Sequence, residues 1–138
     1  MKNIFFMVIS FFSLGVVIAL QADDWPTWRG PNGTGASSEK NVPLEWSVNE
    51  NVVWKATLDE PGNSSPVVAR GKVFITQALD NGKKRCLICF DRHSGEKLWQ
   101  RETSYAELEP THKTNPYCSA SPATDGKVIV ATLGSAGM

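Results

Sequence analysis

Short apolar runs separated by turn-forming residues make up most of the chain after residue 22. Residues 66–69 and 72–77 lie on either side of Arg70-Gly71, a pattern that predicts two strands joined by a tight turn. Asp80-Asn81-Gly82 marks the next reversal. Residues 85–91 and 97–102 then predict a second hairpin with its tip at residues 93–95.

The segments before these hairpins carry a different pattern. Residues 51–58 have a β-branched centre and predict a further strand. Residues 23–50 are rich in Gly, Pro, Asn and Ser, show almost no apolar periodicity and predict an extended lead-in segment, with Trp25, Trp28 and Trp46 as anchors. Helix signals are absent after residue 22, so the pattern predicts an all-β fold.

Part of the sequence is repeated. The segment that starts at Ser65-Pro66 and passes through Gly71 begins again at Ser121-Pro122 and passes through Gly126, with one residue deleted before the glycine. Repeats of about 40 to 55 residues with several short strands each are typical of propeller blades rather than helical solenoids. We therefore expect a partial β-propeller, with about one complete four-stranded antiparallel blade and partial blades beside it.

Two tryptophans occupy equivalent places in this repeat. Trp54 and Trp99 each end a predicted strand shortly before a Ser-Pro start, but the second junction is longer by about 11 residues. The extra residues lie within 103–118 and include His112. Loops on a rigid β scaffold are common places for binding residues, so His112 is the candidate in this loop, although a solvated loop explains it as well.

The sequence at 87–99 resembles the PQQ-like (pyrroloquinoline quinone-type) β-propeller repeat. That repeat has an apolar strand, an aspartate, a Thr-Gly or Ser-Gly turn, a lysine and a tryptophan, and Asp91, Gly95, Lys97 and Trp99 match it. The opening at 24–31 is similar to the lead-in of exported bacterial members. The resemblance implies that the tryptophans pack between blades and that the aspartate and glycine fix a hairpin. The blade positions that follow from the repeat and the resemblance are Trp54, Pro66, Gly71, Asp91, Gly95, Trp99, Pro122 and Gly126.

The same resemblance sets an expectation for size. A complete propeller of this family has about eight blades, so residues 51–138 are expected to be incomplete repeats from the N-terminal part of a longer propeller. The expected partners are the remaining blades or other proteins of the cell envelope. Many members bind no quinone and act as scaffolds, among them the outer-membrane assembly propellers.

The first 22 residues read as an export signal. Lys2 gives a positive start, residues 4–20 are apolar or small throughout, and Ala22 offers a small residue at the cut, so Asp23 becomes the new terminus. The alternative is an uncleaved anchor, since the apolar run is close to the minimum length for a membrane span. Either way the expected location is the periplasm or cell envelope.

Charge and cysteine content exclude some classes of partner. The chain has 14 basic and 14 acidic residues, and this balance argues against nucleic acid or an acidic membrane as the main partner. Cys86 and Cys89 lie three apart in a strand-like run, so they are expected on opposite faces as small core or edge residues. Cys118 is the odd thiol, and the redox state of all three stays open.

Candidate catalytic chemistry is sparse. Quinoprotein dehydrogenases of the superfamily need a catalytic aspartate, calcium ligands and often a vicinal disulfide, and none can be assigned here. Asp80, Asp91 and Asp125 all sit beside a glycine or a Ser-Gly turn, where an aspartate usually bonds its own backbone. We therefore expect no catalytic residue, metal ligand or cofactor. The favoured function is a non-catalytic exported scaffold for protein interaction, and the alternative is part of a quinone-dependent dehydrogenase that would use PQQ with calcium.

Overall fold

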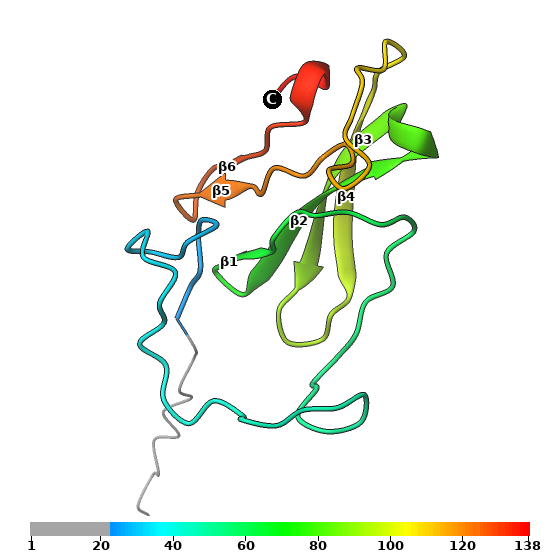
Figure 1. Cartoon of the computed structure of the whole chain (residues 1–138). Coiled ribbons are helices and arrows are strands. Elements are labelled where there is room, and N and C mark those ends of the chain that lie inside the picture. The colour runs from blue at the N-terminus through cyan, green and yellow to red at the C-terminus, as the bar shows by residue number, and fades with distance from the viewer. Residues whose placement is uncertain (1–22) are drawn as a thin grey trace, which may run out of the picture.

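The computed structural model describes residues 23–138, so the predicted export signal lies outside the described residues. The fold is a four-stranded antiparallel sheet in the order β1-β2-β3-β4 with a separate two-stranded hairpin, β5-β6, beside it (Figure 1). The strands are β1 (Val67–Ala69), β2 (Lys72–Leu79), β3 (Lys84–Asp91), β4 (Lys97–Ser104), β5 (Ala123–Thr124) and β6 (Ile129–Val130). Two single 3₁₀ turns, Asp80–Gly82 and Gly134–Ala136, complete the described elements.

Turn chemistry explains why consecutive strands pair. Arg70 and Gly71 both have positive φ, 49° and 73°, which matches the type I′ turn that suits the twist of a hairpin. Ala69 therefore pairs with Lys72 across the turn. At the tip between β3 and β4, the Asp91 carboxylate accepts hydrogen bonds from the backbone N–H groups of His93 and Ser94, at 2.9 and 2.8 Å. These contacts close the tip and set the start of β4.

The four-stranded sheet has an apolar cluster on each face. On one face Ile75, Ile88 and Phe90 form a core with Cys86, and Ala56 packs against it. The opposite face carries Val67, Phe74, Cys89 and Ala78, which pack against Trp99 from β4 and against residues of the second hairpin region, Ile129, Ala131 and Leu133. Successive side chains of a strand alternate between faces, and this alternation separates Cys86 from Cys89 as expected. All three cysteines are free thiols and buried.

The predicted fold class is confirmed, because one complete four-stranded antiparallel blade and part of another are present. The predicted strand at residues 51–58 is wrong. These residues run without strand pairing in the described chain, although Trp54 and Ala56 are partly buried, Ala56 against the sheet, and Lys55 between them is exposed. Strand propensity alone does not make a strand, since the ladder needs a partner with free N–H and C=O groups.

The lead-in is attached to the blade at its start. Trp25 and Val68 exchange two backbone hydrogen bonds of 2.8 Å, which places residue 25 beside the free edge of β1. The Asp24 carboxylate also accepts the backbone N–H of Arg70, at 3.1 and 3.2 Å to its two oxygens. Within residues 23–138 no helix is both long and apolar enough to cross a membrane.

Candidate interaction site

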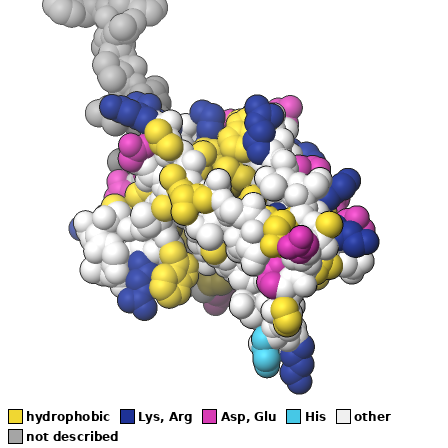
Figure 2. Space-filling view, turned by 90° about the horizontal axis from the view of Figure 1, so that it is seen from above, with side chains coloured by type: hydrophobic (Ala, Val, Ile, Leu, Met, Phe, Trp, Pro, Cys, Tyr) yellow, Lys and Arg dark blue, Asp and Glu magenta, His cyan; other side chains and the backbone are white. Residues whose placement is uncertain are grey.

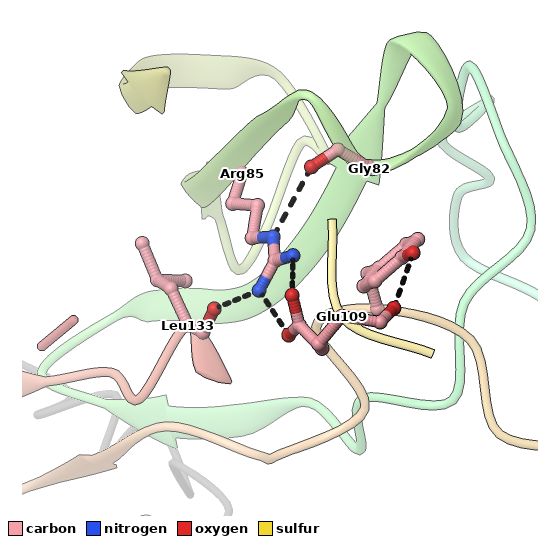
Figure 3. A network of polar contacts seen from close by, with 5 residues as sticks. Gly82, Arg85, Glu109 and Leu133 are labelled. Atoms are coloured by element: carbon pink, nitrogen blue, oxygen red, sulfur yellow. Dashed lines mark hydrogen bonds and ion pairs between the residues drawn. The ribbon is translucent and has the colours of Figure 1, made fainter. Parts of the chain in front are cut away.

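The loop between β4 and β5, residues 105–122, is held at its base by an ion pair between a buried arginine and a partly exposed glutamate (Figure 3). Arg85 lies near the start of β3 and its side chain is fully buried. Its guanidinium donates to both carboxylate oxygens of Glu109, at 2.7 and 2.6 Å, so the pair is bidentate. The remaining donors reach the carbonyl oxygens of Gly82, at 3.1 Å, and Leu133, at 2.7 Å. One guanidinium thus joins the β2–β3 turn, the long loop and the chain after β6.

Two tyrosine rings enclose the same guanidinium. The centroids of the Tyr117 and Tyr105 rings lie 4.5 and 5.1 Å from the Arg85 guanidinium carbon, within the range of cation–π attraction. The Tyr117 hydroxyl donates to the carbonyl oxygen of Glu109 at 2.7 Å, and its ring lies directly on Gly82. Glu109 is therefore fixed through its side chain and its backbone.

Electrostatics keep this pair charged. The hydrogen bonds from Arg85 are the largest cause that lowers the pKa of Glu109, to about 2, and the same bonds raise the pKa of Arg85 above its ordinary value. A buried guanidinium without a partner would be costly, whereas a bidentate carboxylate with two further carbonyl acceptors satisfies its donors. Both members of the pair are therefore charged at neutral pH.

The tip of the loop is exposed but ordered by its own hydrogen bonds. His112 and Asn115 form an isolated bridge, with the Asn115 N–H donating to the His112 carbonyl at 2.8 Å. The imidazole Nδ1 of His112 lies 2.8 Å from the Thr114 hydroxyl, and the Asn63 side chain donates to the Thr114 carbonyl at 2.9 Å. Lys113 projects between them on an exposed stretch. His112 therefore has a structural partner in Thr114.

A surface pocket opens beside this loop. Its lining combines hydroxyl, amide and ring groups with the ion pair, and it includes Arg85, Glu109, Thr111, His112, Asn115, Ser119 and Thr132. Seen from above, hydrophobic side chains reach the surface in several separate groups, and basic and acidic side chains are interspersed among them (Figure 2). Among residues 23–138 no group of three or more potential metal ligands of the His, Cys, Asp and Glu types comes together.

The two tryptophans of the repeat make different contacts. The Trp54 indole N–H donates to the carbonyl oxygen of Arg92 at 2.7 Å, and the Trp54 ring lies on Gly95 so closely that a Cβ there would be 2.5 Å from it. Trp99 packs on the other side of the blade, with its ring centroid 5.9 Å from that of Phe74, near Ile129. Trp54 therefore contacts the β3–β4 tip, whereas Trp99 contacts the sheet face that carries Phe74.

The Ser-Pro segments of the two repeats are neighbours. The Ser65 N–H donates to the Ser121 hydroxyl at 2.9 Å, so the chains just before Pro66 and Pro122 run close together. Gly71 and Gly126 both have positive φ in hairpin turns, and Gly126 lies against the Arg70 side chain. The structure therefore brings both turns to the same end of the molecule.

Two of the three turn aspartates accept backbone hydrogen bonds, and the three thiols are buried. Asp125 accepts the N–H groups of Lys127 and Val128, both at 2.8 Å, and these bonds lower its pKa. The N–H groups of Ser94 and His93 likewise lower the pKa of Asp91. For Asp80 it is the backbone N–H that is bound, by the Glu60 carboxylate at 2.8 Å. Burial raises the pKa of all three thiols, that of Cys86 to about 11, so they are not reactive thiolates at neutral pH.

Sequence reasoning missed the ion pair between Arg85 and Glu109. The two residues are 24 positions apart, and neither belongs to a recognisable motif. One signal was present, because an arginine opens the otherwise apolar run from Cys86 to Phe90 and a buried arginine needs an acid. Nothing in the sequence says which of the acids supplies it.

Comparison with known proteins identifies the family to which the repeat belongs. A family model described as outer membrane protein assembly factor BamB, built on PQQ-type repeats, matches residues 38–137. Searches of curated proteins and of solved structures found no match.

Proposed function

The chain belongs to this BamB-type family of PQQ repeats, and from that premise we propose that it is an exported scaffold that binds other proteins in the cell envelope. The observation that carries the proposal is the match over residues 38–137, which covers the complete blade and the second hairpin. The family takes its description from the assembly of outer-membrane proteins, a process of the bacterial envelope. We further propose that the scaffold acts without catalysis and without a bound cofactor.

The long loop supports a binding role. A loop that is fixed before it meets a partner loses less conformational entropy on binding than a flexible one. The loop at residues 105–122 is anchored by Arg85 at its base and braced by Asn63 at its tip, yet its tip side chains are exposed. We therefore assign the protein contact to the tip, at His112 and Lys113.

In-cell crosslinking tests this assignment. A photo-crosslinking amino acid is placed at Lys113 in the tip, and at exposed Lys97 in β4 as the matched control. The expected result is a discrete adduct with an envelope protein from position 113 that is absent from position 97. The adduct should weaken in Glu109→Gln, because the tip then loses its anchor. Equal labelling from both positions would contradict the assignment.

Export and the cofactor need separate measurements. N-terminal sequencing of the chain recovered from the envelope fraction should give Asp23 as the first residue. An intact Met1 would indicate a retained anchor, and a cytoplasmic location would contradict export.

Titration of the chain with PQQ and calcium, followed by tryptophan fluorescence, should show no saturable binding. Saturable binding at micromolar concentration would instead support part of a quinone-dependent dehydrogenase.

A further inference from the structure

Residues 23–25 attach the lead-in both to the blade and to a later part of the lead-in. Trp25 exchanges two backbone hydrogen bonds with Val68 of β1. Two residues earlier, the backbone nitrogen of Asp23 donates to Oε1 of Glu39 at 2.6 Å, a contact between residues 16 positions apart. The contact between Asp23 and Glu39 therefore closes a loop of the lead-in whose first residues are held on the edge of β1.

Residues 37–39 are arranged so that they hold this contact in place. The Ser37 hydroxyl accepts the backbone N–H of Glu39 at 3.1 Å, which turns the chain just before the carboxylate. The Ser38 hydroxyl donates to Oδ2 of Asp23 at 2.9 Å. Asp23 is thus bound through its backbone nitrogen and through its side chain by two neighbouring residues.

The charges around the Asp23 nitrogen favour a cation at this place. The small pocket beside it is lined by the carboxylates of Asp23 and Asp24 and by uncharged residues. The Arg92 guanidinium lies 3.8 Å from the Asp24 carboxylate, and exposed Lys40 follows Glu39 in the chain. Three carboxylates and two cations leave the surroundings of the nitrogen with a net negative charge, and a nearby negative charge stabilises a cation.

Export cleavage changes the chemistry of this nitrogen without moving it along the chain. While Ala22 is attached, the nitrogen is a neutral amide with one hydrogen. Hydrolysis breaks the bond between them, so that the hydroxyl of water goes to the carbonyl carbon of Ala22 and its proton goes to the Asp23 nitrogen. The resulting α-amine has an ordinary pKa of about 7.7 to 8.0, so at neutral pH it takes up a further proton and becomes an ammonium.

We propose that Glu39 is the binding site for the α-ammonium that export cleavage creates at Asp23, so that the lead-in closes more firmly in the processed chain than in the unprocessed one. A hydrogen bond between two charged groups is about twice as strong as one between neutral groups. Because the pair is exposed, its effect is on the local closure of the lead-in and not on the sheet. This inference rests on the export cleavage proposed above.

The pKa of the α-amine tests the proposal on the processed chain recovered from the envelope fraction. Its amines are dimethylated with ¹³C-labelled formaldehyde, which keeps their charge, and are titrated by NMR. Glu39→Gln retains an acceptor oxygen and removes only the charge. The pKa of the wild-type α-amine should be higher than that of Glu39→Gln by at least about 0.5, a threefold change in the ionisation constant. Glu45→Gln, at another exposed acid of the lead-in, is the matched control and should give the wild-type pKa.

Amide hydrogen exchange of the same chains, also followed by NMR, measures the closure itself. The amides of Trp25 and Val68 should exchange about 2- to 5-fold faster in Glu39→Gln than in the wild type at neutral pH, because an exposed ion pair has been lost. They should be unchanged in Glu45→Gln. The amides of β3 should exchange equally in all three chains, which separates loss of closure from loss of the fold.

The outcomes distinguish this inference from the export on which it rests. An equal α-amine pKa in the wild type and Glu39→Gln would overturn the inference and leave export standing, and so would a processed chain that starts at a residue other than Asp23. Unchanged exchange at Trp25 and Val68 would overturn the firmer closure. An intact Met1 would overturn the inference together with the proposed cleavage.

Discussion

At the scale of single residues, Arg85 is where the fold concentrates its polar interactions. Its guanidinium serves the β2–β3 turn through Gly82, the long loop through Glu109 and the chain after β6 through Leu133. These three segments share no backbone ladder with one another, so the arginine substitutes for the pairing that they lack. Burying the charged guanidinium costs free energy of desolvation, and the bidentate carboxylate and the tyrosine rings offset this cost.

Arg85→Met should lower the free energy of unfolding by about 2 to 4 kcal/mol, because the buried carbonyl groups of Gly82 and Leu133 lose their donor at about 1 to 3 kcal/mol each. Urea denaturation, monitored by tryptophan fluorescence, measures this change in the free energy of unfolding. Lys84→Met removes an exposed cation one position earlier and should change stability by less than about 0.5 kcal/mol. Equal effects from both substitutions would mean that Arg85 is not structural.

The ion pair also predicts how stability depends on pH. The pKa of Glu109 is lowered to about 2 in the folded chain from an ordinary value of 4.5, so its contribution is present above pH 4.5 and is lost as pH falls toward 2. At pH 7, the urea midpoint of Glu109→Gln should therefore be lower than that of the wild type. This difference in urea midpoint should shrink as the pH falls from 4.5 to 2. A gap that stays constant across this range would show that ionisation of Glu109 is not what stabilises the loop.

At the scale of elements, an aromatic ring that lies on a glycine recurs at three joints. Trp25 lies on Gly30 in the lead-in, Tyr117 on Gly82 in the β2–β3 turn, and Trp54 on Gly95 at the β3–β4 tip. Each glycine has positive φ and no Cβ, so the ring approaches the turn backbone directly. Turns that cannot bury side chains of their own are thereby fixed by an aromatic residue from another segment.

Two glycine substitutions separate backbone strain from loss of this ring contact. Gly71 and Gly95 have nearly equal φ, 73° and 74°, but a Cβ at Gly71 meets nothing within 4 Å, while one at Gly95 would lie 2.5 Å from the Trp54 ring. Gly71→Ala should cost about 1 to 2 kcal/mol from the left-handed backbone alone. Gly95→Ala should lower the free energy of unfolding by clearly more than Gly71→Ala does, because the new Cβ meets the Trp54 ring. It should also shift the fluorescence of Trp54. In the Trp54→Ala background the two costs should become similar.

The elements that could be predicted are those that local chemistry determines. The hairpins around Arg70-Gly71 and at the Asp91 tip follow from turn residues within a few positions of one another, and both are present. The strand predicted at 51–58 fails because pairing depends on a distant segment, not on β-branched residues. The contact between Arg85 and Glu109 was missed for the same reason, because it joins residues that only the folded sheet brings together.

At the scale of the whole molecule, stability is unevenly distributed. β2 and β3 pair with each other along eight residues and each has a further strand beside it, so their amides lie in the centre of the sheet. In residues 36–58 only Trp54 and Ala56 are partly buried, and the backbone–backbone hydrogen bonds described there are the two between Ser47 and Glu50. Segments with few protected amides open at low free energy without unfolding the rest.

Hydrogen exchange followed by mass spectrometry should therefore resolve two classes of segment in the full chain. Peptides from β2 and β3 should exchange at least about 100-fold more slowly than peptides from residues 36–58, because their opening approaches the global unfolding free energy. This contrast should hold at low micromolar concentration. Protection of residues 36–58 equal to that of β2 and β3 would show that this segment does not open on its own.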